Sequence, residues 1–159
     1  MNFSEEGKEV YKTYYDLGFK PIRCKGYHPR YNPKQDYRTA KEPVDKGFTA
    51  DTYLAPSLSE IEEWEDQHGW TGWLIPKGYM ALDVEDSWSI KYLEGHFIAS
   101  GVKPLIHITN NGKHYFFKLK GDLSATTEVY TKLGVSVTYR VGGKNYLIMA
   151  PLNGRRWEL

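Results

Sequence analysis

Three stretches of the chain place apolar residues at the spacing of an amphipathic helix. The first spans residues 4–17, the second begins at the capping-box sequence Ser57-Leu58-Ser59-Glu60, and the third begins at Asp86 or Ser87 and ends at Gly101. The apolar positions that mark the three faces are Val10, Tyr14 and Leu17, then Leu58, Ile61 and Trp64, then Ile90, Leu93 and Phe97. Because residues three or four apart lie on one side of a helix, we expect each helix to pack one face against a core.

Short apolar runs between turn residues predict strands. They cover residues 70–75, 79–84, 105–109, 113–119, 135–139 and 146–150. Pro76-Lys77-Gly78 separates the first two runs, and Asn111-Gly112, a strong hairpin signal, separates the middle pair. The Pro-, Gly- and Tyr-rich stretch of residues 25–56 is longer than most connections, which is typical of a functional loop. The order of elements predicts an α+β fold with a mixed or antiparallel sheet backed by helices.

The length of 159 residues corresponds to one domain, so we expect residues 1–159 to form a single unit. No apolar run approaches the roughly 18 residues that a membrane span needs, and residues 1–12 lack the apolar core of a secretory signal. The single cysteine, Cys24, excludes an intramolecular disulfide framework and a CxxC zinc site. The composition therefore favours a cytoplasmic protein that does not associate with membranes.

The net charge of +1 hides an uneven distribution along the chain. Residues 1–50 carry a net charge of +3, residues 51–100 of −8 and residues 101–159 of +6. Within residues 20–41, tyrosines and histidines lie between basic residues, and Asp36 is the one acid. Such a stretch suits phosphates and unstacked bases, although a solvated polar loop has the same composition. The candidate contacts with single-stranded DNA are Arg23, Lys25, Arg30 and Lys34.

A pair of carboxylates follows the strand predicted at residues 79–84. Side chains alternate along a strand, so Asp83 and Glu85 share one face. The apolar Leu82 and Val84 take the opposite face. Two carboxylates at a strand end are suited to holding Mg²⁺ or Mn²⁺ against phosphate oxygens, because hard cations prefer oxygen ligands. A strand that runs out into a polar loop would show the same pattern.

The hairpin around Asn111-Gly112 adds polar groups to this picture. A two-residue turn would place residue 109 opposite residue 114 and residue 107 opposite residue 116. One face would then hold His107, Thr109, His114 and Phe116, while the apolar face of Ile106, Ile108, Tyr115 and Phe117 would be buried by helices. We expect His114 to point away from the core on an open face suited to an anionic ligand, and we interpret His107 as a hydrogen-bonded structural residue.

Two runs of residues form a recognisable pattern. Residues 72–85 are a hydrophobic segment ending in an acid-x-acid pair, and residues 109–117 contain Thr-x-x-Gly-x-His. This pattern resembles the bifunctional primase–polymerase domain of the archaeo-eukaryotic primase superfamily. Shorter matches extend the resemblance over nearly the whole chain: Gly18-Phe19-Lys20-Pro21, Lys41-Glu42-Pro43, Thr49-Ala50-Asp51, Arg140, Gly142-Gly143, Tyr146 and Ala150-Pro151.

The resemblance implies an RRM-like primase catalytic core with an N-terminal α/β section, and template-directed nucleotidyl transfer in the replication of a plasmid, phage or other mobile element. Asp83 and Glu85 would hold the catalytic Mg²⁺ or Mn²⁺. His114 would contact the phosphates of the incoming nucleotide, with Arg140 and Lys113 as further phosphate ligands. The implied partners are a single-stranded DNA template and nucleoside triphosphates. A helicase would lie outside this chain, as another part of a longer replication protein, because no Gly-x4-Gly-Lys-Ser/Thr motif is present.

The sequence departs from the family at the third acidic position. This acid lies two residues before the arginine in the family, where the present chain has Thr138. A neutral hydroxyl is a poor ligand for a hard cation. Thr138 therefore supports an alternative, in which the domain binds nucleotide or single-stranded DNA but catalyses weakly or not at all. Asp122 and Glu128 are the acids we consider as replacements.

Two further classes of protein explain less of the sequence. A metal-dependent nuclease would need an acid-x-Lys pair after Asp83, and the sequence has none. An unrelated RNA-binding fold would use the 15% aromatic content for stacking, but it leaves the acid pair unexplained. The sequence therefore favours an enzyme, a nucleotidyltransferase, over these two classes.

Overall fold

Two antiparallel sheets organise the protein. The computed structural model describes residues 5–121, 127–130 and 134–158, and within these ranges the strand order is β1-β2-β8 in a small sheet and β6-β7-β3-β5-β4-β9 in a large sheet. The strands are β1 (Lys20–Cys24), β2 (Trp70–Leu74), β3 (Tyr79–Val84), β4 (Leu105–Ile108), β5 (Lys113–Lys118), β6 (Thr127–Tyr130), β7 (Ser136–Val141), β8 (Tyr146–Ile148) and β9 (Arg156–Trp157). Every strand pair between them is antiparallel.

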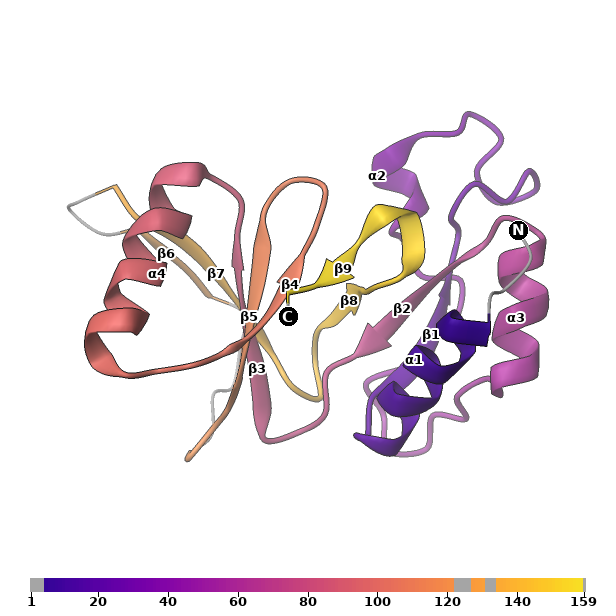
Figure 1. The fold of residues 1–159 in the computed structure, drawn as a ribbon. Coiled ribbons are helices and arrows are strands. Elements are labelled where there is room, and N and C mark those ends of the chain that lie inside the picture. Colours follow the sequence, from indigo (N-terminus) through magenta and orange to yellow (C-terminus); the bar gives the residue numbers. More distant parts are fainter. Residues whose placement is uncertain (1–4, 122–126, 131–133, 159) are drawn as a thin grey trace.

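Helices cover the two sheets on different sides. The helical segments are α1 (Glu5–Asp16), α2 (Tyr37–Ala40), α3 (Leu58–Asp66), α4 (Ser87–Ser100) and a 3-10 turn, η1 (Leu152–Gly154). Helices α1 and α3 lie beside the small sheet, and α4 lies along the outer face of the large sheet (Figure 1). The predicted α+β class, with antiparallel sheets backed by helices, is confirmed. No helix in the described ranges is long and apolar enough to cross a membrane.

Local sequence signals set the helix ends as predicted. At the start of α3, Ser57 accepts a hydrogen bond from the Glu60 amide, and the Glu60 carboxylate accepts one from the Ser57 amide. The Asp86 side chain caps α4 by accepting a hydrogen bond from the Ser89 amide. Gly101 ends α4 in the left-handed conformation, which glycine adopts without a steric penalty.

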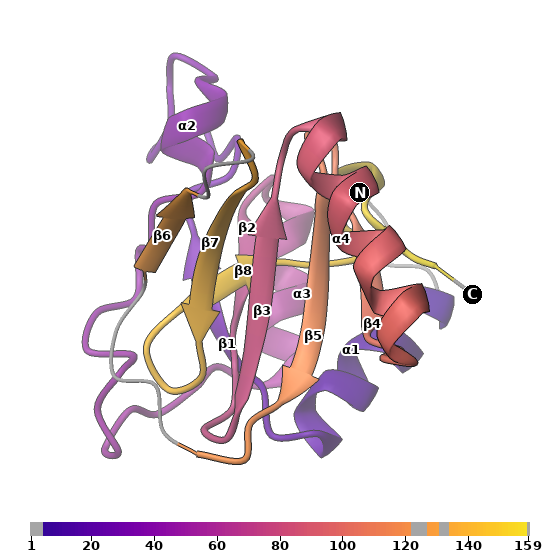
Figure 2. The same ribbon diagram turned by 90° about the vertical axis from the view of Figure 1, so that its left-hand side faces the viewer.

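The two faces of the large sheet pack against different layers. Helix α4 lies along one face of the sheet (Figure 2), where Val84, Tyr115 and Val137 form a core with Phe97 of α4. The prediction that the opposite face is open is wrong. Ala81 of β3 and Phe116 of β5 are buried there in a second core, together with Tyr11 and Tyr14 of α1 and Trp73 of the small sheet. The small sheet and α1 therefore cover the part of this face around Ala81 and Phe116.

The register of the β4–β5 hairpin also differs from the prediction. His107 pairs with His114, and Leu105 pairs with Phe116, so the register is shifted by two residues. The reason is the turn itself: the Thr109 amide donates to the Gly112 carbonyl, and the Gly112 amide donates to the Thr109 hydroxyl. This hydroxyl cap closes a four-residue loop in place of the two-residue turn. Because the shift is an even number of residues, each side chain keeps its predicted face.

Two turns carry the chain between the sheets and are locked together. The first joins β2 to β3, and the second joins β7 to β8. The Gly142 amide donates to the Tyr79 carbonyl, and the Gly143 amide donates to the Ile75 carbonyl. A Cβ atom on Gly142 would lie 1.9 Å from the carbonyl oxygen of Pro76, so only glycine permits this approach. The contact holds the two turns between the sheets together.

The remaining differences concern short or irregular elements. Strand β1 occupies a Pro-Ile segment for which the sequence predicts no strand, and α2 lies within the predicted loop of residues 25–56. The loop is ordered by buried Asn32, whose side-chain amide donates to the carbonyls of Gly26 and Asp36. Strands β6 and β9 are not predicted either. Both are edge strands of the large sheet, whose partners the local sequence does not reveal.

Candidate functional site

A row of polar residues crosses the large sheet. His107 of β4 lies opposite His114 of β5, His114 lies opposite Asp83 of β3, and Asp83 lies opposite Thr138 of β7. Glu128 of β6 is the register partner of Thr138. Directly opposed residues on neighbouring strands have Cβ atoms about 4.5–5.5 Å apart. The antiparallel pairing thus assembles groups from distant parts of the chain along one line.

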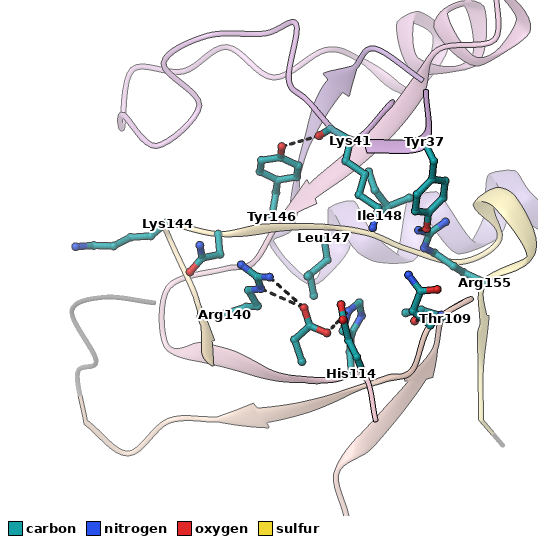
Figure 3. A pocket seen from close by; sticks show the side chains of 14 residues that line it. Tyr37, Lys41, Thr109, His114, Arg140, Lys144, Tyr146, Leu147, Ile148 and Arg155 are labelled. Atoms are coloured by element: carbon teal, nitrogen blue, oxygen red, sulfur yellow. Dashed lines mark hydrogen bonds and ion pairs between the residues drawn. The ribbon is translucent and has the colours of Figure 1, made fainter. Parts of the chain in front are cut away.

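A cavity of about 280 Å³ lies over the Asp83 and His114 part of this row, between the large sheet and the segments around the small sheet (Figure 3). It is lined by Tyr37, Lys41, Asp83, Glu85, Thr109, Asn111, His114, Arg140, Lys144, Asn145, Tyr146, Leu147, Ile148 and Arg155. Four of these residues are lysine or arginine, and two are acids. The lining therefore has a formal excess of positive charge, which favours an anionic ligand.

The Asp83 carboxylate contacts two other residues of the cavity. One carboxylate oxygen accepts from the Nε and Nη2 atoms of Arg140, at 3.3 and 3.1 Å. The other carboxylate oxygen lies 3.5 Å from Nε2 of His114. Burial would raise the pKa of Asp83, but the hydrogen bond from His114 and the Arg140 guanidinium together lower that pKa below its usual value. Asp83 is therefore ionised at neutral pH.

The hydrogen bonds of His107 determine the proton positions on His114. The Ala150 amide donates to Nε2 of His107 at 2.8 Å, so the proton of the neutral His107 ring is on Nδ1. This ring stays neutral because burial, reinforced by the nearby Arg155 charge, lowers the pKa of His107 to about 2. The two Nδ1 atoms are 3.0 Å apart, so His107 donates and His114 accepts. His114 then carries its proton on Nε2, which faces Asp83. The structural role predicted for His107 is confirmed, because its ring is buried and hydrogen-bonded.

Glu85 reaches the same cavity from the end of β3. It follows Val84, the last residue of the strand, and is exposed. The tip of the β4–β5 hairpin packs against this point, where a Cβ atom on Gly112 would lie 2.0 Å from the Val84 carbonyl oxygen. The close approach brings the hairpin loop to the strand end that carries the acids. Asp83 and Glu85 line the same cavity, which agrees with the prediction that they share one face.

Thr138 lies beside the acid pair, at the position where the sequence departs from the primase–polymerase pattern. It is the register partner of Asp83, on the neighbouring strand β7. Of the two acids considered as replacements, Glu128 lies one strand further out, opposite Thr138. Asp122 lies outside the described residues. A threonine thus stands next to Asp83 where the pattern has a third carboxylate.

Lys113 is not part of the cavity, which corrects its predicted placement beside His114. Its ammonium group is 2.6 Å from a carboxylate oxygen of Glu94 on α4 and 3.6 Å from one of Glu158. The reason is the alternation of β5, which turns Lys113 toward α4 when His114 faces the cavity. Arg140, the other cation assigned to the phosphates, does line the cavity.

The four basic residues assigned to DNA lie outside the cavity and fall into two pairs. Arg23 forms a bidentate ion pair with Asp45, and Lys25 pairs with Glu42 at 3.3 Å. Arg30 and Lys34 are exposed, and neither has an ion-pair partner among the residues that the structure describes. Two of the four charges are therefore neutralised locally and two are not.

The rings of the same loop are engaged in stacking within the protein. The His28 ring lies nearly parallel to Trp64 of α3, with centroids 4.9 Å apart, and Tyr31 contacts both rings. The Arg30 guanidinium lies 5.5 Å from the Tyr31 ring centroid. These contacts combine three rings and the Arg30 cation in one surface patch beside α3.

Several cavity residues are not assigned to the site by the sequence. Tyr37 and Lys41 lie in the basic stretch of residues 20–41. The sequence pattern of this stretch predicts a DNA contact and gives no indication that these two residues line the cavity. Lys144 and Arg155 belong to no motif. Arg155 joins the cavity because η1 and β9 fold the chain end back onto the large sheet.

The donor groups are compatible with a hard divalent cation. Asp83 and Glu85 supply carboxylate oxygens to one cavity. Among the described residues, no group of three or more His, Cys, Asp or Glu side chains could hold a metal ion by itself. Two carboxylates with ligand oxygens and water are nevertheless the usual environment of Mg²⁺ bound with phosphates, as opposed to a complete protein cage. The site therefore suits an ion that arrives with a phosphate ligand.

No protein-family model matches the sequence, and no curated protein matches it significantly.

Proposed function

We propose that the chain is a metal-dependent nucleotidyltransferase domain of the primase–polymerase type, which extends or initiates a strand on a single-stranded DNA template. The observation that carries this proposal is the acid pair Asp83 and Glu85, placed with His114 and Arg140 around one cavity rich in cations. Carboxylates beside cations suit a ligand that contains both phosphates and a divalent ion. The catalytic core would be RRM-like, formed by β3, β5, β4 and β7 with α4.

The residues of the site would have two roles, to stabilise charge and to orient the bound groups. Asp83 and Glu85 would hold Mg²⁺ or Mn²⁺, which supplies Lewis-acid stabilisation of the charge on the transferring phosphate. Arg140 holds the Asp83 carboxylate through two hydrogen bonds. His114 presents Nε2–H on the cavity side, where it can donate to a phosphate oxygen. The fold around the cavity would position the nucleotide and exclude part of the surrounding water.

Primer extension tests this proposal. The wild-type chain should extend a primer or synthesise de novo on single-stranded DNA with Mg²⁺ or Mn²⁺. Asp83→Asn and Glu85→Gln should each lower the rate by at least about a hundredfold, because removal of a charge that acts in the transition state typically costs this much. Glu63→Gln, an exposed acid on α3, is the matched control and should retain the wild-type rate.

Two results would contradict the proposal. One is a wild-type chain that incorporates no nucleotide with either ion on any single-stranded template. The other is an Asp83→Asn or Glu85→Gln variant, folded by circular dichroism, that retains the wild-type rate. The two variants together separate loss of chemistry from loss of fold.

A second candidate function is a nucleotide- or DNA-binding module with little or no catalysis. The observation that favours it is the environment of Asp83, whose carboxylate is already engaged by Arg140 and His114 and whose neighbour across the strand pair is Thr138. A chain of this kind would bind nucleotide in the presence of Mn²⁺ but would not extend primers. Nucleotide binding measured beside primer extension distinguishes the two functions.

A further inference from the structure

A buried arginine, Arg155, lines the cavity, and none of the described carboxylates pairs with it. Arg155 is only 5% exposed, and no acid lies within ion-pair distance of it among the residues that the structure describes. Its contacts are neutral: Nη2 donates to the Tyr37 hydroxyl at 3.1 Å, Nη1 lies 3.5 Å from the Leu152 carbonyl, and the guanidinium lies 5.6 Å from the Trp70 ring centroid. A buried charge without a countercharge costs free energy. The position of Arg155 in a cavity therefore indicates that an anion binds there and supplies the countercharge.

A second cation meets the same tyrosine. The ammonium group of Lys41 lies 4.6 Å from the centroid of the Tyr37 ring, and Lys41 has no ion pair within the described ranges either. Burial alone would raise the pKa of Tyr37, but the charges of Arg155 and Lys41 lower it below its usual value. The side chains of Lys41 and Arg155 therefore both contact the uncharged side chain of Tyr37. In Figure 3, Tyr37 and Arg155 lie together at one end of the cavity and Arg140 lies at the other.

We infer that Arg155, Lys41 and Tyr37 form a subsite that binds a phosphoryl group directly, without a metal ion. A phosphate dianion matches two positive charges, and the planar guanidinium can donate two parallel hydrogen bonds to its oxygens. The inference rests on the proposed function for the kind of molecule that carries the phosphate, but the cations themselves do not depend on it. The phosphate belongs either to a nucleoside triphosphate or to the 5′ end of a DNA strand.

Calorimetric titration with sodium tripolyphosphate in excess EDTA tests the subsite, because this probe contains neither base nor sugar and EDTA removes divalent ions. The wild-type chain should bind it. Arg155→Met and Lys41→Met should each weaken the affinity at least about tenfold, the effect expected for loss of one charge-assisted hydrogen bond. Arg155→Lys keeps the charge but loses the guanidinium fork, so its affinity should lie between those of the wild type and Arg155→Met.

Matched controls separate a specific subsite from general attraction of anions. Arg156→Met removes the exposed neighbour of Arg155, and Lys46→Met removes an exposed lysine of the same loop as Lys41; neither residue lines the cavity. Both control variants should bind tripolyphosphate within about twofold of the wild type, since exposed charges contribute little when screened by salt. The inference fails if the wild type does not bind, or if control and cavity variants weaken equally. Lys41 is only half-buried, so Lys41→Met decides the question even where Arg155→Met does not fold.

Two further titrations in EDTA identify the source of the phosphate. If a 5′-phosphorylated oligonucleotide binds more tightly than its 5′-hydroxyl counterpart, and Arg155→Met removes the difference, the subsite holds a strand end. If ATP binds more tightly than adenosine, and Arg155→Met removes that difference, it holds a nucleotide. Primer extension without tripolyphosphate binding would overturn the subsite and leave the proposed function standing. Tripolyphosphate binding without any nucleotide transfer would support the subsite and contradict the proposed function.

Discussion

At the scale of single residues, the hydrogen-bond chain from Ala150 through His107 to His114 determines which nitrogen of His114 faces Asp83. His107 does not line the cavity, so it acts on the site only through His114. An imidazole whose Nδ1 accepts a hydrogen bond must carry its proton on Nε2 when neutral. His107 is therefore a positioning residue, and its effect is visible in the ring protonation of its neighbour.

We expect His107→Leu to release this constraint and His107→Asn to preserve it. The Asn amide nitrogen lies at the same number of bonds from the backbone as Nδ1, so it can still donate to His114. Imidazole nitrogen chemical shifts in the neutral form of His114 should show the Nε2–H tautomer in the wild type and in His107→Asn. A mixture of tautomers should appear in His107→Leu. An unchanged tautomer in His107→Leu would show that Asp83 alone orients the ring.

Glu65 gives a second prediction at this scale. It is a buried carboxyl on α3, and its Oε2 atom accepts from the Tyr11 hydroxyl at 2.8 Å and from the Thr71 hydroxyl at 2.6 Å. Burial outweighs these hydrogen bonds and raises the pKa of Glu65 to about 7. Between the unfolded pKa and this value, the folded state therefore binds a proton that the unfolded state has released.

The sign of the effect on stability follows from that difference. The contribution of protonated Glu65 is fully present below its unfolded pKa of about 4.5 and is lost as pH rises through about 7. Glu65→Gln keeps an oxygen acceptor for both hydroxyls and does not ionise. We expect its free energy of unfolding to match the wild type near pH 4 and to exceed it by about 3 kcal/mol at pH 8. Urea denaturation across this range measures the difference, and parallel curves for both proteins would contradict it.

At the scale of elements, the pairing of β3 with β7 places Thr138 beside Asp83. A gain of function by Thr138→Asp depends on this pairing. A third carboxylate would add charge for a divalent ion that two carboxylates hold only with help from the ligand. The wild type should accordingly be slow in Mg²⁺ and faster in Mn²⁺, which tolerates imperfect geometry better.

We expect Thr138→Asp to raise the rate of primer extension in Mg²⁺ by about tenfold or more, which corresponds to about 1.4 kcal/mol in the barrier. Thr138→Val keeps the β-branched shape without the hydroxyl and should leave the rate close to that of the wild type. Steady-state extension assays with both ions provide the measurement. Brisk extension by the wild type in Mg²⁺, with no gain in Thr138→Asp, would show that a third acid at this position is not needed.

At the scale of the whole molecule, ion pairing changes which basic residues remain available to DNA. Arg23 and Lys25 are paired with Asp45 and Glu42, whereas Arg30 and Lys34, later in the same basic stretch, are exposed. A cation that is already neutralised releases fewer counterions when DNA binds. The contribution of the basic stretch to DNA affinity should therefore come mainly from Arg30 and Lys34.

Salt titrations with a labelled single-stranded oligonucleotide test this expectation. Replacing Arg30 and Lys34 by Gln should lower the slope of log affinity against log salt by about 0.7 for each phosphate that the variant no longer neutralises. Replacing Arg23 and Lys25 by Gln should change the slope less, and removal of the ion pair with Asp45 should lower the thermal midpoint. Equal slopes for the wild type and the Arg30/Lys34 variant would reject this stretch as a DNA-binding surface.

The sequence by itself determined those features that depend on neighbours a few residues apart. The capping box at Ser57 and Glu60, the cap at Asp86 and the strand at residues 79–84 all depend on local hydrogen bonds or on side-chain alternation, and the structure has each of them as predicted. The same alternation correctly placed Asp83 and Glu85 on one side of their strand and His114 on the opposite side of its strand from Tyr115.

Tertiary structure decided which distant residues meet. The two-residue shift of the β4–β5 hairpin arises from a Thr109 hydroxyl that closes a longer turn, and the covering of the predicted open face arises from α1 and the small sheet packing on Phe116. Arg155 reaches Tyr37 only because the end of the chain folds back across the molecule. Such contacts depend on which apolar faces pack together between segments far apart in the sequence. A local pattern of residues does not show which of these faces will meet.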